Sequence, residues 1–349
     1  EDTFATYVGS RFAVAVANGT AALHLNALAL GVKSGDKVIT TPITFAASAN
    51  CVRYCGGDVV FADIDPETYL LDIHAVRSLL KASPKGTYKG IIPVDFAGRA
   101  VDLEAFKKLA DEYGLWIIQD SCHSPGGYFT DSKGEKQHCG NGQFAELAIF
   151  SFHPVKHIAS GEGGMITTND EMLYNKLLKL RTHGITRDES LFENSTGLAN
   201  GNDNSSFSIP NSKFPGWYME MQELGYNYRL TDFQAALGLS QLKRANEGLE
   251  RRKEIAQKYF EAFQDKSFIK GQSGVVVGHA YHLYVVELDD RLGLYNFLRE
   301  NKIFAQIHYF PVHLMPYYRQ FGWKVGDLPN AEQYYKNCIS LPMYPTLTN

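Results

Sequence analysis

Short apolar segments recur in the first half of the chain, and helical or loop segments separate them. The apolar segments cover residues 12–16, 37–41, 59–64, 91–96, 116–120, 147–152 and 165–168. Repeated alternation of this kind predicts an α/β fold in which helices cover both faces of a mainly parallel, seven-stranded sheet. Ligands of such sheets bind beyond the carboxyl ends of the strands, so the residues that follow each segment are the first candidates for a functional site.

Lys156 follows one of these segments, 147–152, and precedes the glycine-rich turn 161–164. Glycines allow the backbone to turn tightly and to approach a bound group closely. The apolar neighbours Val155 and Ile158 would desolvate the amine, which lowers its pKa and makes it a nucleophile toward carbonyl groups. A lysine that forms a Schiff base and an ordinary surface lysine both fit this segment taken alone.

The tripeptide Asn18-Gly19-Thr20 joins the apolar segment 12–16 to an alanine- and leucine-rich run that favours a helix. A strand, a small polar turn and a helix in this order form an anion site, because the first helix amides and the positive end of the helix dipole attract a phosphate. Asn and Thr are also common N-caps, so a plain helix cap is the alternative.

Three further side chains stand at predicted strand ends. Asp120 closes the apolar run LWIIQD, where a carboxylate is costly unless a cation or a hydrogen-bond donor meets it. A protonated pyridine nitrogen would be such a partner, and a helix cap is the plainer explanation. His123 could contact the same ligand or fill a satisfied buried niche. Phe45 could stack on a flat ring or belong to the core.

Length and composition exclude several classes of protein. With 349 residues, 44% of them hydrophobic, the chain can form a large domain, 1–240, and a smaller α+β C-terminal domain, 241–349. The net charge of -4 does not predict binding to nucleic acid or to an anionic membrane surface. The five cysteines lack the spacing of a disulfide framework or a zinc site, and no signal-peptide pattern or membrane-length apolar run occurs, so we expect a cytoplasmic protein. Both ends look cut, and we expect short flanking segments beyond them.

The second half of the chain contains a change of composition. Residues 189–215 are rich in Asn, Ser and Gly, which predicts a mobile surface loop inserted into the large domain. Thr231 or Asp232 would cap the helix that follows, and residues 245–263 are expected to form a long helix that links the two domains. In the smaller domain we expect a strand and then a helix within 283–301.

A histidine-rich run, residues 306–313, lies near the end of the smaller domain. His308 and His313 could suggest a metal, but no carboxylate or cysteine accompanies them and Pro311 breaks the geometry. We therefore expect no metal site.

Taken together, these segments resemble the DegT/DnrJ/EryC1/StrS sugar aminotransferases over essentially the whole chain. The matching pieces occur in family order and at family spacing, and they are NGTAALHL, TPITFAASAN, VDFAG, QDSCHS, FSFHPVKHIASGEGG, LRTHGI, GYNYRLTDFQAALGLSQL and IHYFPVH. The resemblance implies fold type I of the pyridoxal 5'-phosphate (PLP) enzymes, which is aspartate aminotransferase-like. The HPVK and GYNYRL segments are most similar to the UDP-sugar C4 aminotransferases of pseudaminic acid biosynthesis.

The resemblance also implies a role for each site residue. Lys156 would form the Schiff base with PLP, and Asp120 would pair with the pyridine nitrogen. The remaining cofactor contacts would be Gly19, Thr20, Ala21 and Ser151 at the phosphate, Phe45 on the ring, His123 near the ring hydroxyl, and Asn227 from the partner subunit of a homodimer. The substrate contacts would be Arg229, His308, Tyr309 and His313. L-glutamate would convert PLP to pyridoxamine phosphate (PMP), which would then aminate a keto group of a nucleotide-linked 6-deoxy sugar.

Two other functions stay open on the sequence. Related PLP-dependent sugar dehydratases carry a histidine where this chain has Lys156, with a further histidine beside it, and His157 is retained here. A non-catalytic regulatory protein could keep the fold without the chemistry. Two departures from the family limit what can be carried over: the usual N-terminal glycine-containing segment lies before Glu1, and the 189–215 loop is longer than in many relatives.

Overall fold

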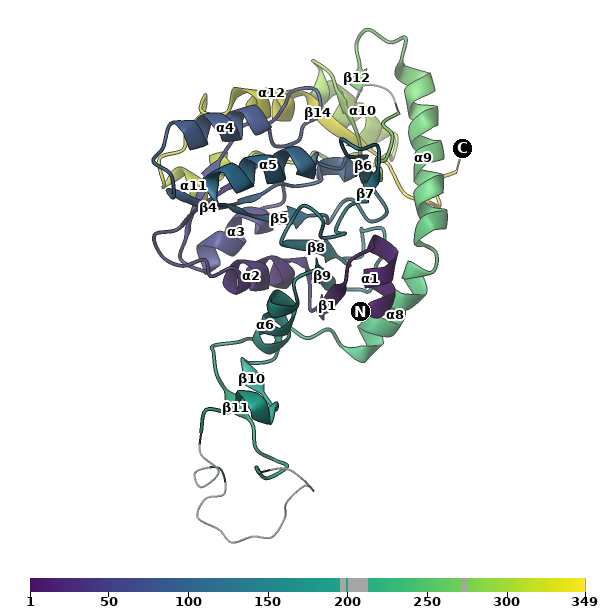
Figure 1. The fold of residues 1–349 in the computed structure, drawn as a ribbon. Coiled ribbons are helices and arrows are strands. Elements are labelled where there is room, and N and C mark those ends of the chain that lie inside the picture. Colours follow the sequence, from purple (N-terminus) through teal and green to yellow (C-terminus); the bar gives the residue numbers. More distant parts are fainter. Residues whose placement is uncertain (195–198, 200–212, 272–274, 349) are drawn as a thin grey trace.

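The computed structural model describes residues 1–194, 199, 213–271 and 275–348 (Figure 1). Its centre is a seven-stranded sheet with the order β1-β9-β8-β5-β4-β2-β3. The strands are β1 (Phe12–Val16), β2 (Lys37–Thr40), β3 (Asp58–Phe61), β4 (Tyr88–Ile92), β5 (Trp116–Asp120), β8 (Leu147–Ser151) and β9 (Gly164–Thr168). β9 runs antiparallel to β1 and β8, and the other neighbours pair in parallel. The predicted α/β fold with a mainly parallel sheet of seven strands is confirmed.

Helices cover both faces of this sheet because successive strand residues point to opposite sides. Ile39, Ile91 and Ile117 pack into one core, and the residues next to them in the chain pack into the other. The first core is covered by α4 (Ile73–Lys81) and α5 (Leu103–Tyr113). The second is covered by α2 (Gly19–Ala29), α3 (Ala47–Tyr54) and α6 (Glu171–Arg181). A short helix, α1 (Asp2–Val8), packs with β1 and β9 at the sheet's edge (Figure 1).

Two predicted strands are too long at their carboxyl ends. The apolar segment 59–64 was expected to be strand throughout, but β3 ends at Phe61. The apolar segment 91–96 was expected to be strand throughout, but β4 ends at Ile92. Pro93 has no N–H to continue the ladder, and Phe96–Gly98 forms a 3-10 turn in which Ala97 has a positive φ of 59°. The strand therefore stops early, and its last residues form a turn at the edge where ligands are expected.

The predicted elements of the C-terminal part are present. Thr231 caps α8 (Asp232–Leu242) through a capping box, and α9 (Ala245–Phe263) matches the predicted long helix. A three-stranded sheet of β12 (Lys270–Gly271), β13 (Tyr284–Glu287) and β14 (Cys338–Leu341) follows, with helices α10 (Arg291–Glu300), α11 (Pro316–Arg319) and α12 (Pro329–Asn337). The predicted domain boundary at 240/241 falls inside α8, and the division into 1–240 and 241–349 stays a prediction.

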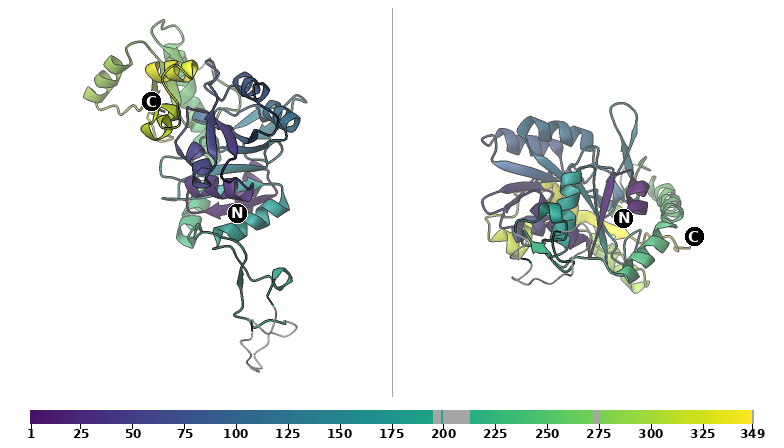
Figure 2. Two further views of the ribbon diagram at one scale, coloured as in Figure 1. Left: turned by 90° about the vertical axis from the view of Figure 1, so that its left-hand side faces the viewer. Right: turned by 60° about the horizontal axis from the view of Figure 1, so that its bottom comes forward.

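A two-stranded arm of β10 (Ile185–Thr186) and β11 (Glu220–Met221) projects from the main body (Figures 1 and 2). Most of the predicted loop 189–215 lies outside the described residues. Its described ends include a 3-10 turn, Glu189–Leu191, which the prediction of a plain loop did not anticipate. The sequence also did not reveal a small hairpin of β6 (Tyr128–Thr130) and β7 (Lys136–His138). No helix of the described chain is long and apolar enough to span a membrane.

Candidate active site

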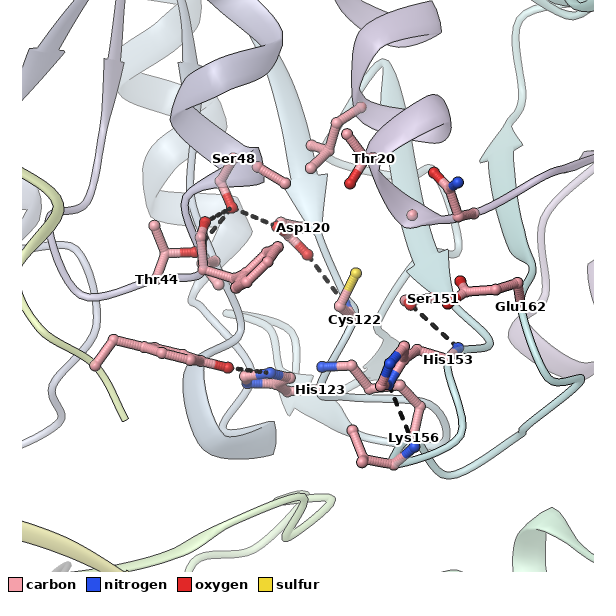
Figure 3. Close-up of a pocket in the computed structure, with 18 residues that line it drawn as sticks. Thr20, Thr44, Ser48, Asp120, Cys122, His123, Ser151, His153, Lys156 and Glu162 are labelled. Atoms are coloured by element: carbon pink, nitrogen blue, oxygen red, sulfur yellow. Dashed lines mark hydrogen bonds between the residues drawn. The ribbon is translucent and has the colours of Figure 1, made fainter. Parts of the chain in front are cut away.

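A cavity of about 430 Å³ opens at the carboxyl edge of the large sheet. Segments that follow β1, β2, β5 and β8 contribute its walls, as expected for an open parallel sheet. Its lining residues are Asn18, Gly19, Thr20, Leu23, Thr44, Phe45, Ala47, Ser48, Val94, Asp120, Cys122, His123, Ser151, His153, Val155, Lys156, Glu162 and Tyr309 (Figure 3).

The first turn of α2 forms one wall of this cavity. Asn18 caps the helix by accepting a hydrogen bond from the Ala21 amide (2.8 Å), so the Ala21 amide is already used. Gly19 and Thr20 line the cavity. Gly19 lies close to Ser151, and a Cβ on Gly19 would make a tight contact of 3.0 Å with Cβ of Ser151. The turn is thus a helix cap that also lines the cavity, and Ser151 lines the same cavity. A helix N-terminus in this position can hold a phosphate.

Asp120 is a buried carboxylate that faces the cavity, with only 4% of the residue exposed. The hydroxyl of Ser48 donates to its Oδ2 (2.7 Å), and the amide of Cys122 donates to its Oδ1 (3.1 Å). None of the ion pairs formed by the described residues includes Asp120. A buried carboxylate held by two neutral donors suits a ligand that supplies a cationic N–H.

Lys156 extends from the turn after β8 into the same space as Asp120 and His123 (Figure 3). Its amide donates to the His153 carbonyl (2.9 Å), which closes the turn. Burial lowers the pKa of the Lys156 amine, and the nearby Cys122 and Asp120 offset part of this shift. This direction agrees with the sequence prediction. A larger fraction of the amine is therefore neutral and nucleophilic than for an exposed lysine.

Aromatic and imidazole rings form the opposite wall. Phe45 is 63% exposed and lines the cavity, so it is not a core residue and its ring is available to stack on a flat ligand. His123 is buried, and burial lowers its pKa well below the usual value, with a smaller contribution from the Lys156 charge. Its Nε2 lies 3.3 Å from the hydroxyl of Tyr309.

The predicted residues do not all meet in this cavity. Asn227 and Arg229 are exposed and are not among the lining residues. His308 pairs through Nδ1 with the Ser340 hydroxyl (2.9 Å), also outside the lining. His313 is fully buried, with Nε2 3.2 Å from Oε1 of Glu332. His313 therefore lies outside the cavity lining.

The sequence profile of the DegT/DnrJ/EryC1/StrS aminotransferase family matches residues 1–349. The chain belongs to this family. SpsC, a spore coat polysaccharide biosynthesis protein of Bacillus subtilis (strain 168), is 38% identical over 361 residues, which cover 100% of the chain and 85% of SpsC. PseC of Helicobacter pylori, an aminotransferase involved in the biosynthesis of pseudoaminic acid, has a TM-score of 0.83 at 29% identity. That match covers 100% of the chain and 85% of PseC.

Spr1654 of Streptococcus pneumoniae, assigned as a sugar aminotransferase, has been solved in PLP and PMP forms. The PLP form has a TM-score of 0.82 at 25% identity and covers 100% of this chain and 86% of its own. The chain described here is therefore an enzyme of the PLP-dependent sugar aminotransferase family, and PLP is its cofactor. Its own cavity fits that group, because the first turn of α2, a buried carboxylate without a cation, a lysine amine and an exposed aromatic ring face one space.

Two supporting residues of the aminotransferase were missed in the sequence. Ser48 donates to Asp120 from α3, although the two are 72 positions apart. Asp95 is fully buried and accepts hydrogen bonds from the side chains of Gln119, Ser121 and Ser124 (2.7–2.9 Å), which shapes the loop that carries Cys122 and His123. A buried carboxylate requires hydrogen-bond donors, and this requirement was the only sign of them in the sequence. It does not show which distant hydroxyl donates.

Proposed function

We propose that this enzyme transfers an amino group from L-glutamate to a keto group, at C4, of a UDP-linked 6-deoxy sugar. The observation that carries amino transfer is the meeting of Lys156, Asp120 and the first turn of α2 in one cavity. The narrower substrate rests on similarity to PseC, an aminotransferase involved in the biosynthesis of pseudoaminic acid, and to SpsC, a spore coat polysaccharide biosynthesis protein. These neighbours support, but do not specify, the sugar, the nucleotide and the ring carbon.

Each residue has a defined task in this proposal. Bound PLP supplies an aldehyde for amines and a ring that accepts electrons from an adjacent carbanion. Gly19, Thr20 and Ser151 hold the phosphate, and Asp120 holds a proton on the pyridine nitrogen by pairing with it. Burial lowers the pKa of the Lys156 amine, so more of it is neutral than in an exposed lysine; this amine would hold the cofactor covalently and would move the proton at the α-carbon of the amino donor.

We further propose that the active unit is a homodimer. α8 has no buried residue, and its apolar side chains Phe233 (81% exposed), Leu237 (40%) and Leu239 (44%) face outward. Exposed apolar surface of this kind is typical of an interface. Asn227 and Arg229 precede α8 and do not line their own cavity. In the proposed dimer, Asn227 reaches the phosphate and Arg229 the substrate in the partner's cavity.

Sugar dehydration is the alternative that the sequence left open. In this enzyme the position that carries histidine in the dehydratases is Lys156, which lines the cavity. His157 is turned away from the lining, and its ring centroid lies 5.5 Å from that of His282. We therefore assign amino transfer.

We also expect a cytoplasmic location, consistent with the five free thiols of the chain.

The decisive experiment offers UDP- and dTDP-linked 4-keto and 3-keto 6-deoxy sugars in parallel with ¹⁵N-labelled L-glutamate, and analyses each product by NMR. We expect ¹⁵N on C4 of the UDP-linked sugar, and no transfer by Lys156→Ala. Nitrogen on C3, or turnover of the dTDP-linked sugar alone, would overturn the narrower assignment. Loss of a sugar oxygen without any gain of nitrogen would overturn amino transfer itself.

A further inference from the structure

Three residues from separate segments form a short hydrogen-bond chain that ends at the cavity. The backbone amide of Ala97 lies 3.3 Å from Nδ1 of His123. Nε2 of His123 lies 3.3 Å from the hydroxyl of Tyr309, which lines the cavity. The direction of these two hydrogen bonds decides what Tyr309 offers to a ligand.

The first bond has only one possible direction. A backbone N–H can donate but cannot accept, so Nδ1 of His123 must present its lone pair to Ala97. His123 is 4% exposed, and its burial beside Lys156 and the rings of His282 and Tyr309 disfavours the charged imidazolium. A neutral imidazole carries one proton, which must therefore be on Nε2. Nε2–H donates to the Tyr309 oxygen.

The Ala97 amide is held in this direction by its surroundings. Ala97 has a left-handed backbone conformation (φ 59°), which is unfavourable for a residue with a Cβ and persists only when neighbouring structure enforces it. The Ala97 carbonyl accepts from the Leu283 amide (3.1 Å), and the Gly98 carbonyl accepts from the Ala280 amide (2.8 Å). A Cβ on Gly98 would lie 2.9 Å from the His123 carbonyl. The turn is thus clamped between two segments.

Tyr309 can then use its own proton in only one way. Its oxygen already accepts from His123, and burial raises its pKa, so the hydroxyl stays protonated. Within the described residues, no acceptor is recorded for that proton. A hydroxyl that accepts one hydrogen bond also becomes a better donor of its own.

We propose that the Ala97–His123–Tyr309 chain makes Tyr309 a dedicated hydrogen-bond donor to a ligand oxygen that carries no proton. Building on the proposed function, that oxygen is either the keto oxygen of the acceptor sugar or the ionised ring oxygen of PLP. The consequence for a keto oxygen is selectivity. A ketone accepts from Tyr309, whereas the ammonium group of the aminated product can only donate, so the same hydroxyl favours the substrate over the product.

The direction of these two hydrogen bonds can be tested on the apoenzyme, without cofactor or turnover. Nitrogen-15 chemical shifts of labelled histidines distinguish the two neutral tautomers, and His123→Gln identifies the His123 signals by their loss. We expect His123 to carry its proton on Nε2. A proton on Nδ1, or a charged ring at neutral pH, would overturn the proposal whatever the reaction of the enzyme is.

The function of the donor is tested with Tyr309→Phe, which removes only the hydroxyl. If the ligand oxygen is the keto oxygen, kcat/KM for the keto sugar falls about tenfold while the inhibition constant of the amino-sugar product changes less than twofold. If it is the ring oxygen, the PLP dissociation constant of the apoenzyme rises about tenfold instead. Changes below twofold in both quantities would overturn the proposal.

Two further comparisons distinguish loss of the Ala97–His123–Tyr309 hydrogen bonds from general damage to the fold. Tyr318→Phe is the matched control, because Tyr318 lies in the same segment but donates to Oδ1 of Asn50 (2.7 Å) outside this cavity. We expect it to leave the keto-to-amino preference unchanged. His123→Leu should lose the preference, and His123→Gln should restore it, because a Gln side chain can accept from Ala97 and donate to Tyr309. Equal loss in both His123 variants would contradict the positioning role of this residue.

Discussion

Among the residues that the structure describes, Ser48 is the only one whose hydroxyl donates to the buried carboxylate of Asp120, and Ser48→Ala removes that hydroxyl. The Ser48 hydroxyl donates to Oδ2 over 2.7 Å. Because its one proton is used there, it accepts a hydrogen bond from the Thr44 hydroxyl (2.8 Å). Hydrogen bonds to charged groups contribute about 1.5–3 kcal/mol to stability. Within the described chain, Cys122 then remains as the hydrogen-bond partner of Asp120, through its amide and its side chain.

This loss should be visible in the melting temperature of the apoenzyme. An unfolding entropy of roughly 2.1 cal/mol/K per residue gives about 0.7 kcal/mol/K for 349 residues. A loss of about 1.5–3 kcal/mol therefore lowers the melting temperature by about 2–4 °C. Differential scanning calorimetry of the apoenzyme without PLP measures this shift directly.

Thr167→Val is the matched control for Ser48→Ala. The Thr167 hydroxyl is also buried and also makes a 2.7 Å hydrogen bond, but its acceptor is the neutral carbonyl of Gly140. A neutral hydrogen bond contributes about 0.5–1.5 kcal/mol, so the control should lower the melting temperature by at most about 2 °C. A Ser48→Ala shift no larger than that of Thr167→Val would refute the argument that Ser48 stabilises a charge.

Lys156→Ala should abolish both turnover and the near-visible absorbance of the PLP-loaded enzyme, and full activity in this variant would contradict the assignment of Lys156. Mixing Lys156→Ala with Asn227→Ala subunits should restore activity, since each mixed dimer then has one intact site; no rescue would place Asn227 in its own subunit's cavity. Burial lowers the pKa of His308 to about 4 and of His279 to about 3. Unfolded histidines, with a pKa near 6.5, bind protons that these folded ones cannot, so apoenzyme stability should be constant above about pH 6.5 and fall from there toward about pH 4 and below. Denaturation midpoints that do not change between pH 7 and pH 5 would contradict this.

The sequence by itself determined the sheet and most of the chemistry-bearing residues. Apolar segments at intervals along the chain predict buried strands because backbone and side-chain periodicity act over a few residues. Asp120 ends one such segment, and Thr20 and Lys156 lie in the turns that follow two others. The strand prediction failed where a local feature, Pro93 followed by the turn at Ala97, ended β4 early.

The tertiary structure alone decided which partners these residues have. Ser48 and Asp120 are 72 positions apart, and His123 and Tyr309 are 186 apart, yet each pair is joined by a hydrogen bond. The same packing placed His313 against Glu332 rather than in the cavity, although the family resemblance implied that His313 contacts the substrate. Side-chain partners over such separations depend on how whole segments pack, and the short-range pattern of a sequence does not contain that information.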